Sequence, residues 1–82
     1  MAQTLTVEVS ATHVGRVIIT LAEAGISEAG IKETGRTPIR KEGGVVLFAR
    51  RFTISCQIAE EKIKELVEEL DGVPAAIIST SP

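Results

Sequence analysis

The sequence predicts an α+β fold built from strands and helices in the order β-α-β-β-α-β. Two observations lead to this prediction: two segments carry apolar residues at helical spacing, and the segments around them alternate or are rich in β-branched residues. The chain has 82 residues, of which 44% are hydrophobic and 24% are charged. This length and composition are typical of a water-soluble protein, so we expect residues 1–82 to form a single domain.

The beginning of the chain predicts a strand followed by a helix. Residues 4–10 (TLTVEVS) alternate between polar and apolar, as in a strand with one buried face. Residues 13–26 (HVGRVIITLAEAGI) carry an apolar stripe that indicates a helix lying on a sheet. Ser10 or Thr12 is placed to cap the start of this helix, and Gly25 is placed to end it in a left-handed conformation.

The middle of the chain predicts two strands joined by a turn. An extended but weakly apolar strand begins at residue 30 and ends either at residue 34 or at Ile39. Pro38 lacks a backbone donor, so this strand should lie at a sheet edge. Gly43-Gly44 indicates a turn. Residues 45–55 (VVLFARRFTIS) follow as a long β-rich run, which is either regular or interrupted by a bulge near Arg50-Arg51.

The last part of the chain predicts a helix and a closing strand. Residues 59–71 carry a second apolar stripe, with Glu60 and Glu61 at the positive end of the helix dipole and Gly72 at the other end. Residues 74–79 (PAAIIS) follow as a short strand. With right-handed crossovers and a central hairpin, this order gives a ferredoxin-like sandwich, in which one antiparallel four-stranded sheet has two helices on one face.

The run at residues 45–55 and the strand at residues 74–79 are apolar on both sides. Whichever register the long strand adopts, apolar side chains should remain on the sheet face that the helices leave open. Such a surface is usually covered by a partner, and a small domain gains stability from the extra burial. We therefore expect a homo-oligomer, with a dimer as the first expectation.

Basic residues are concentrated in the middle of the chain. Residues 32–51 hold six basic and two acidic residues, although the net charge of the whole chain is −2. The hairpin is therefore either a solvated element whose charges prevent edge-to-edge pairing, or an anion-binding element, because arginine and glycine amides suit phosphate and carboxylate groups. The candidate anion-binding residues are Arg36, Arg40 and Lys41.

A second candidate site lies at the start of the first predicted helix. The backbone amides there are free to meet a carboxylate, and Gly15 would let a ligand approach the backbone closely. We expect this segment to form a ligand site with the start of the second strand. The candidate ligand-binding residues are Thr12, His13, Val14, Gly15, Arg16, Ser27 and Ile31.

The sequence offers few residues for catalysis. Cys56 and His13 are far apart in the sequence and too few for a structural zinc site, so we predict no enzymatic activity, no metal and no other cofactor. The acidic net charge and the lack of RNP-like aromatic spacing argue against nucleic-acid binding. No apolar run is long enough to span a bilayer, and no signal peptide is recognisable. We therefore expect a cytoplasmic protein without a membrane partner.

Residues 6–31 (TVEVSATHVGRVIITLAEAGISEAGI) resemble the opening of an ACT domain, where a strand runs through a glycine-containing loop into a helix ending in an AGI turn. The resemblance extends less specifically through residues 43–55 and 60–80. ACT domains are ferredoxin-like modules that pair by edges or faces and bind small ligands at the interface. The resemblance implies a regulatory module that senses an amino acid or another small carboxylate metabolite and acts through a partner enzyme or regulator chain. The family's usual acid and proline before the glycine are replaced here by His13 and Val14.

Residues 24–36 (AGISEAGIKETGR) also resemble the helix-to-strand passage of PII-type signalling proteins. These proteins share the fold, form trimers and bind nucleotides in clefts near a long loop after the second strand. Residues 35–44 would be a much shortened version of that loop, and the family's C-terminal phosphate-binding stretch is missing. This alternative implies a signalling protein that binds a nucleotide or another anion. A further alternative is a structural oligomerisation protein that has no ligand.

Overall fold

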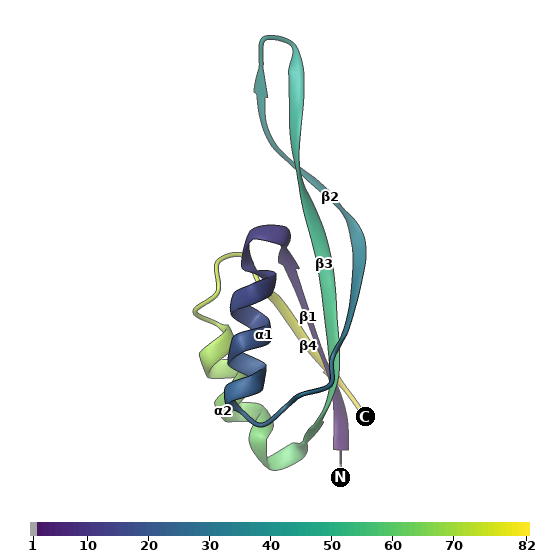
Figure 1. The fold of residues 1–82 in the computed structure, drawn as a ribbon, viewed down its shortest axis with the longest axis vertical. Helices are drawn as coiled ribbons and strands as arrows, with labels where there is room; N and C mark the ends of the chain where they lie inside the picture. The colour runs from purple at the N-terminus through teal and green to yellow at the C-terminus, as the bar shows by residue number, and fades with distance from the viewer. Residues whose placement is uncertain (1) are drawn as a thin grey trace.

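The computed structural model describes residues 2–82 and has the predicted order of elements (Figure 1). The elements are β1 (Ala2–Ser10), the short 3-10 helix η1 (Ala11–His13), α1 (Val14–Glu23), β2 (Gly30–Glu42), β3 (Val45–Ala59), α2 (Glu60–Leu70) and β4 (Ile77–Ser81). The strands form one antiparallel sheet in the order β2-β3-β1-β4. Both helices lie on one face of this sheet, so the predicted ferredoxin-like sandwich is confirmed.

The hydrophobic core lies between the sheet and the two helices. Alternate residues of β1 and β3 point into it, as the strand period of two requires. The buried apolar side chains are Leu5, Val7, Val9, Ile54, Cys56 and Ile58 from the sheet, Val17, Leu21, Leu66 and Leu70 from the helices, and Val73 after α2. The apolar stripes predicted for both helices therefore face the sheet. No helix within residues 2–82 is long and apolar enough to cross a membrane.

The two ends of α1 differ in how well they were predicted. Gly25 has a φ of 87°, which confirms the left-handed residue expected after the helix. The capping prediction is wrong, because η1 lies between β1 and α1 and the N-cap residue of α1 is His13, whose side chain makes no capping hydrogen bond. The Ser10 and Thr12 hydroxyl groups instead lie 2.7 Å apart and share a hydrogen bond.

β2 and β3 extend well beyond the rest of the sheet. β1 ends at Ser10, which is opposite Arg51, so the earlier residues of β3 pair with β2 alone. Residues 36–50 thus form a two-stranded ribbon, which stands clear of the helices in Figure 1 and contributes to a molecule measuring 51 × 20 × 18 Å. Gly43 and Gly44 close the ribbon at positive φ, as a two-residue hairpin turn requires.

The irregularities of the hairpin lie on β2, so β3 takes the regular one of its two expected registers and has no bulge at Arg50-Arg51. The register shifts once between Glu33 and Gly35, opposite Phe52 and Arg51, and again between Pro38 and Arg40. An extra residue on the edge strand disturbs a single ladder, whereas one at this point of β3 would disturb its pairing with both β1 and β2. The position of Pro38 on an edge strand is as predicted.

The open face of the sheet is polar where the helices cover the opposite face, so the prediction of an apolar open face is wrong there. Its side chains include Thr4, Thr6, Glu8, Thr53, Ser55 and Gln57, which alternate with the core residues of β1 and β3. Ile77 is an apolar exception and is 59% exposed. The large exposed apolar side chains of β3 lie on the ribbon, namely Val45, Val46, Leu47 and Phe48.

Candidate functional site

The structure does not bring the two parts of the predicted ligand site together within one chain. Residues 12–16 lie at the start of α1, whereas Ser27 and Ile31 follow its other end. The ten residues of α1 separate them by about 15 Å, given a rise of about 1.5 Å per helical residue. The start of α1 therefore has to be considered with the elements that do surround it.

Arg16 is the predicted site residue that reaches a neighbouring element. A Cβ atom added to Gly72 would lie 3.6 Å from the Arg16 Nη2 atom, so the guanidinium lies beside the loop of residues 71–76, which joins α2 to β4. The other residues of this segment make less contact. Thr12 and Gly15 are exposed, a Cβ at Gly15 would meet no atom within 4 Å, and Val14 packs against the core.

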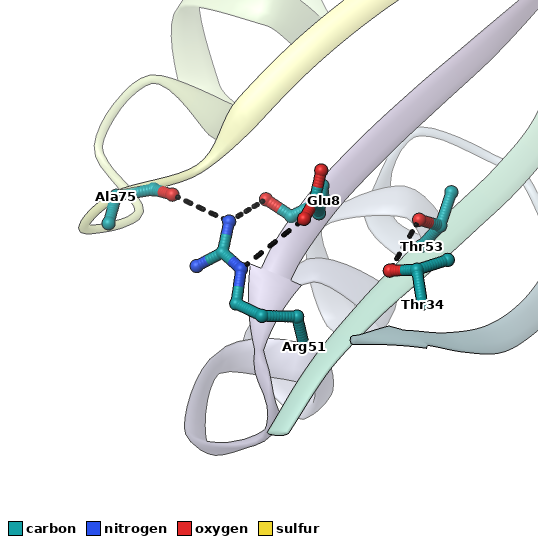
Figure 2. A network of polar contacts seen from close by, with 5 residues as sticks. All are labelled: Glu8, Thr34, Arg51, Thr53 and Ala75. Atoms are coloured by element: carbon teal, nitrogen blue, oxygen red, sulfur yellow. Dashed lines mark hydrogen bonds and ion pairs between the residues drawn. The ribbon is translucent and has the colours of Figure 1, made fainter. Parts of the chain in front are cut away.

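Arg51 on β3 contacts the same α2–β4 loop from the side of the sheet. Its side chain is only 12% exposed, and Figure 2 shows the guanidinium between Glu8 and Ala75. The Nε atom donates to Glu8 Oε1 at 3.5 Å, and Nη2 donates to the carbonyl oxygens of Glu8 and Ala75, each at 3.4 Å. Beside this group, the Thr53 hydroxyl donates to Thr34 at 3.1 Å and joins β3 to the bulged part of β2 (Figure 2).

The three basic residues predicted to bind an anion lie on two faces of the ribbon. Arg36 is opposite Arg50 and Lys41 is opposite Val46, which places both on the same side of the hairpin as Phe52. Arg40 is opposite Leu47 and therefore points to the other side, where Nη2 lies 3.1 Å from Glu42 Oε2. Arg36 and Lys41 can meet one ligand only if that ligand extends along the ribbon.

Arg50 and Glu33 form the strongest ion pair of the ribbon base. Arg50 donates to both carboxylate oxygens, with distances of 3.1 Å from Nε and 2.6 Å from Nη2, and its guanidinium lies 5.2 Å from the centre of the Phe52 ring. The hydrogen bond from Arg50 is the main cause that lowers the pKa of Glu33; desolvation opposes it, and the charges of Arg50 and Arg36 lower the pKa further. Glu33 is thus a carboxylate that neutralises Arg50 at neutral pH.

These contacts define a candidate site at the end of the four-stranded sheet, where the ribbon begins. Arg16 and Arg51 approach the α2–β4 loop from two different elements. Arg36 lies nearby on β2 but on the other face of the hairpin from Arg51, together with Arg50 and Phe52. Guanidinium groups bind phosphate and carboxylate through two parallel hydrogen bonds, so this arrangement is suited to an anion. Arg51 was not among the predicted site residues, because its contacts join residues 24 and 43 positions apart in the sequence.

The other predicted ligand-binding residues, Ser27 and Ile31, lie at the opposite end of the sheet. Ser27 and Gly30 border a hollow of about 480 Å³ beside the start of β2. The remaining lining residues are Thr4, Glu28, Ala29, Ser55, Cys56 and Gln57. This lining offers hydroxyl, amide and carboxylate groups but no basic side chain. Within residues 2–82, no three His, Cys, Asp or Glu side chains lie close enough to hold a metal ion.

Comparisons with known proteins identify the fold. No family model and no curated protein sequence matches the chain. A nitrogen regulatory PII-like protein from Thiomonas intermedia K12, solved with ADP, AMP and bicarbonate, superimposes with a TM-score of 0.75 and 15% sequence identity, covering 96% of this chain and 86% of that one. The chain shares the fold of PII-like proteins.

Two further solved structures have the same fold. A putative PII-like signalling protein from Thermus thermophilus has a TM-score of 0.69 and 17% identity, covering 98% of this chain and 83% of that one. A divalent cation tolerance protein from the same organism has a TM-score of 0.69 and 16% identity, covering all of this chain and 84% of that one. These similarities favour the PII resemblance found in the sequence, while the ACT resemblance stays a prediction.

Proposed function

We propose that this chain is a PII-like regulatory module that binds an anionic metabolite at the base of the ribbon and acts through a partner chain. The observation that carries the proposal is the approach of Arg16 and Arg51 to the α2–β4 loop beside the ribbon. An adenine nucleotide is the first candidate ligand, because a protein of the same fold was solved with ADP and AMP. The proposed role is binding, without catalysis.

The ribbon base has a charge arrangement that an anion would stabilise. Arg36 and Arg50 are directly opposite each other in the ladder, and like charges at such positions are destabilising. Glu33 neutralises Arg50, but among the described residues no salt bridge joins Arg36 to an acidic side chain. A phosphate group beside Arg36 would balance this remaining charge and leave the Arg50–Glu33 pair in place. Arg51 lies on the opposite face of the hairpin, so it would contact a different phosphate group of the same ligand.

The test is calorimetric titration of the protein with ADP, AMP, bicarbonate and a set of amino acids. We expect ADP to bind, and Arg16→Gln and Arg36→Gln each to weaken it by several-fold to about a hundredfold, since a hydrogen bond to a charged group contributes about 1.5–3 kcal/mol before solvent screening. Arg40→Gln is the control, because Arg40 lies further along the ribbon and is already paired with Glu42. Its affinity for ADP should equal that of the wild type.

Each other outcome of this titration has a clear meaning. Binding of ADP that is unaffected by both substitutions would place the site elsewhere, with the hollow beside Ser27 as the next location to examine. Binding of an amino acid in place of ADP would favour the amino-acid sensor implied by the ACT resemblance. If none of these compounds binds, the proposed function is rejected and a structural oligomerisation protein becomes the better description.

A further inference from the structure

We propose that Arg51 acts as a latch that fixes the α2–β4 loop. An anion bound at the ribbon base would release this loop by accepting the hydrogen bonds that the Arg51 guanidinium now donates to it. The inference rests on the proposed function and assigns to the same site a means of regulation. It makes the α2–β4 loop and the start of β4 the part of the molecule that changes when the ligand binds.

The position of Arg51 suits a latch because one side chain joins three parts of the molecule. Arg51 is opposite Ser10 in the last pair of the β1–β3 ladder, where the sheet becomes the two-stranded ribbon. From there its guanidinium reaches Glu8 on β1 and the Ala75 carbonyl in the loop (Figure 2). Glu8 is in turn opposite Ile77, the first residue of β4. A change at Arg51 therefore acts on the end of the loop at Ala75 and, through Glu8, on the first residue of β4.

The contacts of Arg51 leave room for a better partner. They measure 3.4–3.5 Å, whereas charge-assisted hydrogen bonds from a guanidinium are typically about 2.7–2.9 Å long. A phosphate group can accept two parallel hydrogen bonds from the same guanidinium at the shorter distance. It would then compete with the Ala75 carbonyl, while the β1–β3 ladder keeps the backbone of Arg51 in place.

The loop residue whose carbonyl Arg51 contacts has an unfavourable backbone conformation. Ala75 has a φ of 56°, the one positive value at a non-glycine residue in the described part of the chain, and the Cβ of an L-residue is crowded there. The neighbouring hydrogen bond from the Ala76 amide to the Val73 carbonyl is long, at 3.4 Å. Loss of the Arg51 contact would therefore let Ala75 return to an ordinary backbone conformation.

The latch itself can be tested on the protein without any added ligand. Hydrogen exchange should be at least several-fold faster at the amides of residues 76–78 in Arg51→Gln than in the wild type, with little change at the core amides of β1. Arg50→Gln is the matched control, because Arg50 is exposed and paired with Glu33. Equal exchange at residues 76–78 in the wild type and in Arg51→Gln would overturn the latch, and so would a uniform increase along the whole chain.

The coupling to the ligand is tested by repeating the measurement with saturating ADP. Exchange at residues 76–78 should rise in the wild type and should not rise further in Arg51→Gln. Ala75→Gly should weaken ADP binding by a few-fold, because glycine adopts positive φ readily and so stabilises the latched loop. Slower exchange at residues 76–78 with ADP, or tighter binding by Ala75→Gly, would overturn the release. If ADP does not bind at all, the proposed function fails, while the comparison without ligand still decides whether the latch exists.

Discussion

Two neighbouring arginines of β3 have different roles because side chains alternate along a strand. Arg50 lies on the same side of β3 as Phe52, is largely exposed and pairs with Glu33 across the hairpin. Arg51 points to the open face, is nearly buried and contacts two carbonyl oxygens and one carboxylate. The same residue type one position apart thus provides a surface ion pair in one case and a link between three elements in the other.

Cys56 allows a prediction at the scale of one residue. Its side chain is buried opposite Leu5, and desolvation raises the pKa of its thiol, so little reactive thiolate is present at neutral pH. We expect a thiol reagent such as a soluble aromatic disulfide to react with Cys56 at least about tenfold more slowly in the folded protein than in denaturant, because both thiolate fraction and access are reduced. Equal rates in the two conditions would contradict the burial of this residue.

The same scale shows which residues could be predicted from the sequence. The left-handed conformation of Gly25 and the turn at Gly43-Gly44 were predicted correctly, because a glycine at the end of a helix or in a tight turn follows from local geometry. The positive φ of Ala75 and the role of Arg51 could not be predicted in this way. The role of Arg51 depends on a contact between residues 24 positions apart, which no local pattern encodes. Ala75 follows Pro74 in a turn closed by the hydrogen bond from the Ala76 amide to the Val73 carbonyl, at a position that takes positive φ in a type II turn but is usually glycine.

At the scale of elements, the ribbon is the feature that the sequence pattern described least well. The predicted strand began at residue 30 and ended at residue 34 or at Ile39, whereas β2 continues to Glu42. Its later residues are mostly polar or basic and do not have the composition of a strand, so they are extended because β3 pairs with them. A two-stranded ribbon is only marginally stable by itself, which makes its cross-strand side-chain pairs important.

The Arg50–Glu33 pair gives the ribbon base a predictable dependence on pH. The pKa of Glu33 is lowered in the folded protein from its ordinary value of 4.5, first by the hydrogen bond from Arg50. A lowered pKa means that the pair stabilises the folded hairpin fully above the unfolded pKa and less as the pH falls through the folded pKa. We therefore expect amides of β2 near Glu33 to be equally protected from pH 8 down to about 5 and to lose protection at more acidic pH.

The measurement is hydrogen exchange of the wild type and of Glu33→Gln across this pH range, corrected for the intrinsic exchange rate. In Glu33→Gln the charge of Arg50 has no partner at any pH, so protection near residue 33 should be lower throughout and should lose most of its dependence on pH. The effect should be local and small, because an exposed ion pair contributes little to overall stability. An identical pH profile in the two proteins would show that another acidic group is responsible.

At the scale of the whole molecule, the arrangement of the layers could be predicted but the shape could not. The order β-α-β-β-α-β has few compact solutions, so recognising six elements was sufficient for the topology. The elongated shape arises because β1 stops at Ser10 while β3 begins six residues before the partner of Ser10. The sequence pattern gives no measure of this difference in length. The sequence pattern also did not predict that the exposed apolar residues lie mainly on the ribbon.

We therefore expect the homo-oligomer to assemble through the ribbon. Val45 and Phe48 are 60% and 51% exposed, and a β3 edge that lacks a partner strand adjoins them. Light scattering should show a defined assembly at micromolar concentration, and Phe48→Asp should shift it towards the monomer because a carboxylate would be desolvated at the interface. The variant should stay folded, since Phe48 lies outside the core. Ile19→Asp on α1 is the control, because Ile19 is 60% exposed and lies away from the ribbon, so it should leave the assembly intact. A wild type that remains monomeric, or an equal loss of assembly in both variants, would contradict assembly through the ribbon.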